Sequence, residues 1–290
     1  MNLFIIVPVH NRKNTVLNFL KQLSFQTYQN FNTVIVDDGS KDGTFDSIKQ
    51  LHPSVELIYG NGEWWWSKSV NMGVKYAISL KATHILLMND DIYFSKNFLF
   101  QMLSDYTPGS IMGCLSLIKG EPDKIFFSGV NKINKITANT RQYHKKYTPV
   151  YTTLKGLHKS IALPGRGLLI PTNVFSKIGY FDEKRLPQYK ADSDFVIRAY
   201  KAGIPTYINY NAIIYNEVEK TGKGASFLKT SFKDFLKSYF SKYSHNSLRS
   251  NFYFKLKHGV KILIPFLMLE FILKSIVFHL YNNYLKKYSK

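Results

Sequence analysis

Cysteine is nearly absent from this chain, and acidic residues are scarce. Cys114 is the single cysteine among 290 residues, which excludes an internal disulfide framework and favours a reducing compartment. Asp and Glu number 19 against 39 Lys and Arg, so the formal net charge is +20. A charge of this size needs an anionic partner or surface, and nucleic acid and an anionic membrane are the two candidates.

A signal peptide is not expected at the N-terminus. The first apolar run covers only residues 3–7, no basic segment precedes it, and Pro8 follows at once. Internal repeats and low-complexity segments are also absent from the sequence. Hydrophobic residues make up 45% of the chain, so it can bury a substantial core, and disorder is not expected. We therefore interpret the first residues as a buried strand.

Apolar runs and amphipathic stretches alternate along most of the chain. We predict strands at 3–9, 31–40, 55–60, 83–91 and 205–217, and helices at 13–26, 43–51, 67–80 and 192–203. This alternation predicts an α/β fold with a mostly parallel central sheet flanked by helices. In such folds ligands bind beyond the carboxyl ends of the strands. Two of the predicted strands end in acid pairs, Asp37-Asp38 and Asp90-Asp91, which is the first functional signal.

The last quarter of the chain has a different composition. From Lys220 onward there are 14 Lys and Arg but only two acids, which supplies +12 of the +20 charge. The run 260–285 is strongly apolar, but two lysines, a glutamate and a proline interrupt it. A helix that spans a membrane needs about 20 mostly apolar residues, so we expect this run to lie at an anionic membrane interface instead.

The change in composition divides the chain into a catalytic domain, 1–224, and a basic helical segment, 225–290. Packing of this segment on the main domain, or on a second subunit in a homo-oligomer, is the alternative to the membrane interface.

Five stretches resemble, in order and spacing, the family 2 nucleotide-sugar glycosyltransferases. They are the opening "IIVPVHNR" through "VDDGSKDGT", "GEWWWSKSVNMGVKYA", "LLMNDDIYF", "GYFDE" and "ADSDFVIRAYKAG". The resemblance covers about residues 1–217 and implies a GT-A fold. It implies an inverting, metal-dependent enzyme that moves a sugar from a UDP- or dTDP-sugar to a hydroxyl group.

The Trp-rich loop at 64–66 is similar to the branch that contains rhamnosyl- and galactofuranosyl-transferases of bacterial surface polysaccharides. This resemblance implies that the acceptor is a glycan or a lipid-linked saccharide. It also implies a cytoplasmic enzyme, peripheral on the inner face of the plasma membrane.

The "NDD" motif implies a metal-diphosphate site. By the resemblance, Asp91 binds Mn²⁺ or Mg²⁺, both of which prefer hard oxygen ligands, and Asp90 faces the ribose or diphosphate. Asn89 stands where many relatives have Asp, and its carbonyl oxygen can still bind metal, although without charge. Asp38 is expected to accept a hydrogen bond from a uracil or thymine N–H. Asp37 is expected to fix the turn with Ser40.

Further donor contacts are expected around these acids. They come from Pro8, Val9, His10, Asn11, Trp65, Trp66, Asn71 and Arg166. His10 would stack on the base, although a lone histidine is more often an ordinary surface residue. At least one of three adjacent indoles should stack on a sugar ring, unless they only close the top of the sheet. Arg166 lies between two glycines, which let the backbone approach a ligand, but an exposed arginine is often merely solvated.

The resemblance makes Asp192 the catalytic base. In the family an acid pair precedes this helix, and here the pair reads Ala191-Asp192. Asp192 would take a proton from the acceptor hydroxyl, which attacks the anomeric carbon while the nucleotide diphosphate leaves. Asp194 is the competitor, but two positions along a helix it points elsewhere, so we expect it to stabilise the helix N-terminus. No histidine follows the strand at 205–217, where Asn216 or Glu217 could substitute, and Lys220 or Lys223 could neutralise diphosphate.

Two other functions remain open from the sequence. Aromatic and basic residues interleave at 227–257, as in proteins that bind single-stranded nucleic acid. Asn89 and Ala191 would also suit a non-catalytic scaffold with a degenerate donor site. Retention of the three key aspartates at 38, 91 and 192 favours the enzyme, and nucleic acid is not the expected partner.

Overall fold

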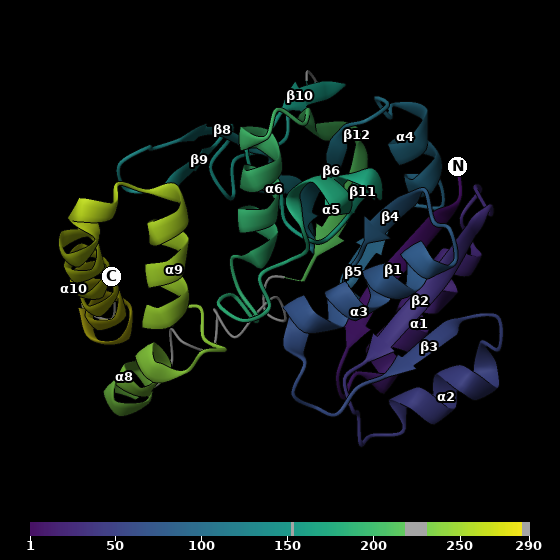
Figure 1. The fold of residues 1–290 in the computed structure, drawn as a ribbon, viewed down its shortest axis with the longest axis horizontal. Helices are drawn as coiled ribbons and strands as arrows, with labels where there is room; N and C mark the ends of the chain where they lie inside the picture. The colour runs from purple at the N-terminus through teal and green to yellow at the C-terminus, as the bar shows by residue number, and fades with distance from the viewer. Residues whose placement is uncertain (152–153, 218–230, 286–290) are drawn as a thin grey trace.

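The computed structural model describes residues 1–151, 154–217 and 231–285 (Figure 1). Its main sheet has the strand order β10-β12-β6-β11-β4-β1-β2-β3, with β5 and β7 paired to β12 and β6. The strands are β1 (Leu3–Val9), β2 (Phe31–Asp37), β3 (Glu56–Tyr59), β4 (His84–Leu87), β5 (Ile92–Phe94), β6 (Ile111–Ile118), β7 (Glu121–Phe127), β8 (Val130–Ile133), β9 (Thr140–Gln142), β10 (Leu157–Lys159), β11 (Leu168–Pro171) and β12 (Thr206–Asn216).

Helices cover both faces of this sheet and extend from it at the C-terminal end (Figure 1). They are α1 (Lys13–Ser24), α2 (Thr44–Leu51), α3 (Trp65–Ser79), α4 (Phe98–Ser104), α5 (Asn173–Ile178), α6 (Ala191–Lys201), α8 (Phe232–Phe240), α9 (Leu248–His258) and α10 (Ile264–Leu280). A short 3₁₀ turn, Lys261–Leu263, precedes α10, and a π-helical turn, Tyr281–Leu285, follows it.

Strand β1 shows how the sequence divides the core between the two faces. Its side chains alternate, so that Phe4 and Ile6 join α3 and α6 in one buried cluster. Ile5 and Val7 join α1 and α4 in the other. A strand buried on both faces must be apolar throughout, as "LFIIVPV" is. The predicted α/β fold with a mostly parallel sheet is therefore confirmed.

The middle of the chain adds the antiparallel part of the sheet. β1 pairs in parallel with β2 and β4, and β6 pairs in parallel with β12. Strand β11 lies between β4 and β6 and is antiparallel to both. The region 111–160, which the sequence left unclear, forms β6, β7 and a small β8–β9 hairpin. Because β11 is antiparallel to β4, the loop just before β11 lies at the same edge of the sheet as the residues that follow β4.

The C-terminal helices differ in how they meet the rest of the molecule. Helix α9 is bound to α6, because Lys257 and His258 lie 3.2 and 2.9 Å from the buried carboxylate of Asp194. Helix α10 lies farther out, at the edge of the molecule (Figure 1). Phe235 of α8 stacks on His279 of α10 with ring centroids 4.2 Å apart. Helix α9 therefore packs on the main domain. Helix α10 contacts the other C-terminal helices with one face and exposes the opposite face.

Candidate active site

The acid pair that follows β4 lies against a cation from the other side of the site. Arg12 Nη1 lies 2.8 Å from Asp90 Oδ1 and 3.4 Å from Asp91 Oδ2. Burial raises the pKa of Asp90 to about 6, while Arg12 acts in the opposite direction. The sequence did not identify Arg12, although a basic residue just after the first strand was a signal that could have found it.

Two oxygens of the acid pair fit a divalent cation. Asp90 Oδ2 and Asp91 Oδ1 are buried and have no hydrogen-bond partner within the described part of the chain. Buried carboxylate oxygens without a partner are costly unless a cation or donor meets them. No group of three metal-ligating side chains occurs in 1–151, 154–217 and 231–285. Mg²⁺ and Mn²⁺ suit such a site, since one or two carboxylates can hold Mg²⁺ while substrate phosphates and water complete its shell.

Asn89 and Trp66 meet beside the acid pair. The indole Nε1 of Trp66 lies 3.5 Å from Asn89 Oδ1. This weak contact uses the oxygen that was expected to bind metal, and the metal role of Asn89 stays a prediction. A β-carbon added to Gly165 would lie 2.3 Å from Trp66 Cζ2, so the indole covers Gly165 closely. Trp66 therefore forms one wall between Asn89 and the loop that precedes β11.

Asp38 builds a loop in this structure. Its Oδ1 accepts the N–H of Gly62 at 2.9 Å, and its Oδ2 accepts those of Trp64 and Trp65 at 2.9 and 2.8 Å. Three of its acceptor positions are thus filled by the chain itself. This carboxylate therefore orders the backbone of the Trp loop, and its expected hydrogen bond to a base stays a prediction. Asp37 Oδ1 accepts the Ser40 N–H at 2.9 Å, which confirms the predicted turn.

The C-terminal end of β1 and the residues that follow it lie beside the end of β2 and the residues that follow that strand. Pro8 and Val9 pair with Val36 and Asp37 in the parallel ladder. The Nδ1 atom of His10 lies 2.6 Å from the carbonyl oxygen of Asp38, and its ring is exposed. Asn11 accepts the Lys41 N–H at 2.8 Å. Residues 8–11 therefore lie together as predicted, and their contact with a base stays a prediction.

Two expected donor contacts have partners within the protein. Trp65 stacks on Tyr243 with ring centroids 3.6 Å apart and planes 10° from parallel. Asn71 is buried: its Nδ2 donates to the carbonyl of Phe181 at 3.0 Å, and its Oδ1 accepts the N–H of the same residue at 3.1 Å. Trp65 thus contacts the C-terminal segment and Asn71 the 181–183 loop, and their contacts with the donor stay predictions.

Asp192 reaches the same site from α6. Its Oδ2 accepts the Gly165 N–H at 3.0 Å, and its Oδ1 accepts the Ser193 N–H at 2.7 Å. The neighbouring Arg166 donates to Asn216 Oδ1 at 2.6 Å. Burial lowers the pKa of Arg166, and the carboxylates of Asp91 and Asp192 oppose that change. The guanidinium of Arg166 therefore lies within electrostatic reach of both the predicted metal ligand and the predicted base.

Asn216, the last residue of β12, and Glu217 after it both have partners within the protein, and a role of either in place of the missing histidine stays a prediction. Asn216 is fully buried and orients Arg166, while Glu217 pairs with Lys119 at 2.6 Å. Neither was expected to act through another side chain, and their partners could not be read from the sequence. Lys220 and Lys223 lie outside the described residues.

This fold, with carboxylates at the ends of two of its strands, agrees with the GT-A fold that the sequence resemblance implied. The model of the glycosyl transferase family 2 matches residues 4–163. That is more than half of the chain, and the protein belongs to this family. The activity that follows from this membership is the transfer of a sugar from a nucleotide-sugar donor.

Several relatives agree with this assignment. An uncharacterized glycosyltransferase of Rickettsia typhi is 26% identical over 298 residues, which cover 98% of this chain and 81% of the relative. The N-acetylglucosaminyl-diphospho-decaprenol L-rhamnosyltransferase of Mycobacterium tuberculosis is 20% identical over 224 residues, covering 71% of this chain and 73% of that one.

Solved structures share the fold at low identity. The Pyrobaculum calidifontis mannosyltransferase in complex with GDP-Man and Mn²⁺ has a TM-score of 0.59 and 13% identity, over 94% of this chain and 69% of that one. Staphylococcus aureus TarS in complex with UDP-GlcNAc has a TM-score of 0.54 and 18% identity, over 94% and 72%. At these identities the likeness shows the fold alone.

Proposed function

We propose that this protein is an inverting, metal-dependent glycosyltransferase of bacterial surface-polysaccharide synthesis. It would move a sugar from a UDP- or dTDP-sugar to a hydroxyl of a glycan or lipid-linked saccharide. The proposal depends most on one set of contacts: Asp192 accepts the Gly165 N–H at 3.0 Å, and Trp66, which covers Gly165, lies 3.5 Å from Asn89 in the "NDD" motif. These contacts bring the proposed proton acceptor and the proposed metal-binding acids to one site. The Mycobacterium tuberculosis relative, named as a rhamnosyltransferase acting on a diphospho-decaprenol, supports a lipid-linked acceptor.

The chain's own residues can perform a single displacement. The Gly165 N–H orients Asp192, whose carboxylate takes the proton from the acceptor hydroxyl. The hydroxyl oxygen then bonds to the anomeric carbon, and the bond to the diphosphate oxygen breaks on the opposite side, which inverts the configuration. A divalent cation held by Asp91 and Asp90 would neutralise charge on the diphosphate when bound. Arg166 supplies a fixed positive charge beside the leaving group.

The outer face of α10 supports docking on a membrane. Ile262, Phe266, Leu269, Leu273 and Val277 are exposed and recur every three or four residues, so they form one stripe. The span Lys261–Asn283 is long and apolar enough to cross a membrane, and an 18-residue window within it has a mean hydropathy of 1.9. The opposite face of α10 is occupied, since Ile264, Leu267 and His279 are buried.

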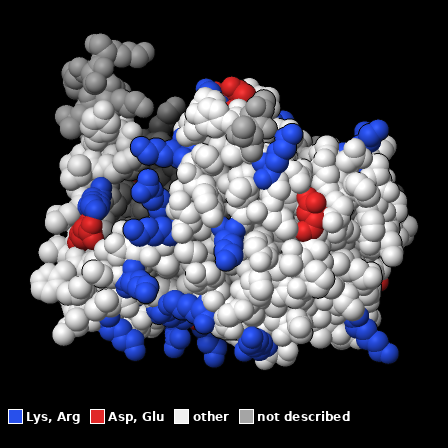
Figure 2. Space-filling view, turned by 90° about the horizontal axis from the view of Figure 1, so that it is seen from above, with Lys and Arg blue, Asp and Glu red and all other residues white. Residues whose placement is uncertain are grey.

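A helix with protein on one side and an apolar stripe on the other suits an interfacial position. Lys and Arg outnumber Asp and Glu on the face drawn in Figure 2, and several of them lie toward its left side. These cations would favour an anionic surface, because each adds about 1 kcal/mol of attraction. We therefore place the enzyme on the cytoplasmic face of the plasma membrane as a peripheral protein.

A donor screen tests the function. The full chain is incubated with a set of UDP- and dTDP-sugars in the presence of Mn²⁺ or Mg²⁺, and hydrolysis or transfer is measured by nucleotide release. Turnover of one sugar, with an inverted anomeric configuration in the first product seen by NMR, is the expected result. Retention of configuration would contradict the single displacement, and the absence of turnover with all donors would contradict the assignment of donor class.

A further inference from the structure

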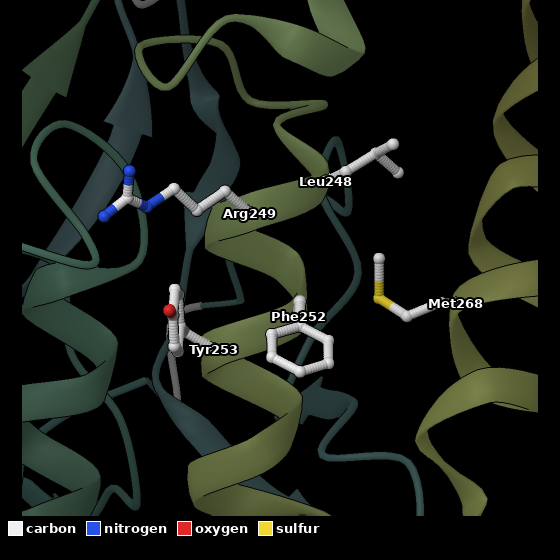
Figure 3. Close-up of a pocket in the computed structure, with 5 residues that line it drawn as sticks. All are labelled: Leu248, Arg249, Phe252, Tyr253 and Met268. Carbon is white, nitrogen blue, oxygen red and sulfur yellow. The ribbon is translucent and has the colours of Figure 1, made fainter.

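Two neighbouring hollows of the C-terminal segment share one arginine. The first, a shallow groove of about 610 Å³ that is largely open to solvent, lies between α9 and α10 and is lined by Leu248, Arg249, Phe252, Tyr253 and Met268 (Figure 3). The second, of about 370 Å³, is formed by the Trp loop, the 183–187 loop and residues of the C-terminal segment. Its lining residues are Glu63, Trp64, Lys68, Glu183, Lys184, Pro187, Lys242, Tyr243 and Arg249. Arg249 therefore stands where the two hollows meet.

The first hollow is chemically suited to a hydrocarbon chain. In Figure 3 the side chains of Leu248 and Phe252 on α9 and Met268 on α10 extend into the space between the two helices, and Arg249 points the other way. Phe252 is 39% exposed, although it lies between two helices that could have buried it. An apolar side chain left open in a groove gains from a ligand that covers it.

The second hollow is chemically suited to phosphate and sugar. Four cationic side chains line it against two acidic ones, and one of these acids, Glu183, already accepts the Nδ2 hydrogen bond of Asn71 at 2.7 Å. Its aromatic residues already hold two of these cations, since Lys68 lies over the Trp64 ring at 5.3 Å and Lys242 over the Tyr243 ring at 4.8 Å, so ammonium groups and ring edges meet at one place where a sugar diphosphate could lie. An uncharged ligand would leave these lysines and the arginine without a counter-charge, and a cationic ligand would be repelled by them.

The Trp loop connects the second hollow with the catalytic residues. Trp64 lines the hollow, Trp65 stacks on Tyr243 of its wall, and Trp66 contacts Asn89 and covers Gly165. Gly165 in turn donates its N–H to Asp192. Three consecutive residues thus lead from the hollow to the catalytic base.

We propose that the two hollows together form the site of an acceptor lipid, a long prenyl chain that carries a sugar on a diphosphate. This assignment rests on the proposed function. The prenyl chain lies between α9 and α10 against Phe252 and Met268, and the diphosphate binds Arg249 with the lysines of the second hollow. The sugar lies beside Trp64 and Tyr243, on the path to Asp192. The exposed stripe of α10 lets the chain pass from the bilayer into the groove.

Binding of sugar-free probes tests this site without turnover. Decaprenyl diphosphate, decaprenol and inorganic pyrophosphate are titrated into the full-length protein in detergent micelles, and dissociation constants are measured by thermophoresis. We expect decaprenyl diphosphate to bind at least about tenfold more tightly than either fragment, because it occupies both hollows. Equal binding of decaprenol would show partition into the micelle only and would overturn the proposal, as would equal binding of pyrophosphate.

Three variants separate the two halves of the site. Phe252→Ser and Met268→Ser should each weaken decaprenyl diphosphate by about tenfold and leave pyrophosphate unchanged, since they remove apolar contacts alone. Arg249→Glu should weaken both phosphates by about tenfold or more. Lys233→Glu on α8 is the matched charge control and Phe100→Ser on α4 the matched apolar control, and both should bind all probes as the wild type does. If the three variants bound decaprenyl diphosphate as tightly as the two controls do, the proposed acceptor site would be wrong.

The same samples also distinguish failure of this site from failure of the proposed function. UDP and dTDP, each with Mn²⁺, are titrated into every variant. Unchanged nucleotide binding with reduced decaprenyl diphosphate binding supports a separate acceptor site. A wild type that turns over a donor but does not prefer decaprenyl diphosphate overturns the acceptor site and leaves the glycosyltransferase standing. A wild type that prefers decaprenyl diphosphate but uses none of the UDP- or dTDP-sugars overturns the proposed donor class and supports the lipid site.

Discussion

The carboxylate of Asp194 lies 2.9 Å from Nε2 of His258, a residue 64 positions later in the chain. Asp194 is fully buried and also lies 2.9 Å from Arg198 Nε and 3.2 Å from Lys257 Nζ. These partners hold the pKa of Asp194 at about 2, although burial alone would raise it. The helix that carries the proposed catalytic base therefore contacts the C-terminal segment through a buried acid, and Lys201 of the same helix adds a contact to His258 Nδ1 at 3.2 Å.

Asp194→Asn should destabilise the protein by about 3 kcal/mol, near the lower end for a broken buried ion pair, because two of its cationic partners remain partly solvated. Urea unfolding measures this loss. Asp234→Asn is the control, since Asp234 forms an exposed pair with Lys237 at 3.7 Å and should cost at most about 1 kcal/mol.

The wild type and the Asp194→Asn variant also give a pH dependence. Folding lowers the pKa of Asp194 from 3.8 to about 2, so the unfolded chain binds more protons between these values. The stabilisation is therefore complete above about pH 4 and is lost as the pH falls through 2. The difference in unfolding free energy between wild type and Asp194→Asn should shrink over this window, and a constant difference would contradict the assigned ionisation.

Gly165→Ala should lower kcat by about 100-fold, because an added β-carbon would push the Trp66 indole or the loop that orients Asp192. Adding Trp66→Phe removes the ring atoms nearest to that β-carbon and should restore part of the rate. Steady-state transfer measures both variants. A Gly165→Ala enzyme with wild-type kcat would show that this close contact does not position the base.

Removal of divalent metal with EDTA should abolish transfer, and Mn²⁺ or Mg²⁺ should restore it. Asp91→Asn should weaken Mn²⁺-dependent binding of the nucleotide, as measured by calorimetry with UDP or dTDP, because it removes a charged oxygen ligand with an unpartnered atom. Asp42→Asn, in the loop before α2, is the control. Equal nucleotide affinity with and without metal would contradict the metal assignment.

Phe266→Ser and Leu273→Ser together should release the protein from anionic vesicles, since these side chains are 71% and 54% exposed on the outer stripe of α10. Sedimentation with vesicles containing phosphatidylglycerol measures the bound fraction. Phe100→Ser is the control, because Phe100 is 59% exposed but lies on α4. Unchanged sedimentation of the double variant would contradict docking through α10.

Local sequence pattern was enough for most of the fold. The strand at 3–9 matches β1, and the helix at 192–203 begins and ends within two residues of α6. Hydrophobic periodicity and strand-ending acids are properties of short segments, so they can be read without knowing the partners. The turn between Asp37 and Ser40 was predicted for the same reason.

Long-range pairing explains what the sequence did not reveal. Nothing near Asp194 indicates that a helix ending at His258 will meet it, so its role was expected to be local. The hydrogen bonds from Asp38 to backbone N–H groups of the Trp loop could not be read from the sequence either. The stacking of Trp65 on Tyr243 could not, because the two residues lie far apart along the chain.

The most direct measurement compares Asp192→Asn with the wild type in two assays, transfer of sugar and binding of nucleotide with Mn²⁺. The amide side chain of this variant would keep a hydrogen-bond acceptor facing Gly165 but could not take a proton from the acceptor hydroxyl. We expect the rate of sugar transfer to fall by about 100- to 10,000-fold, with unchanged nucleotide affinity. Transfer near the wild-type rate would contradict the assignment of Asp192 as the catalytic base.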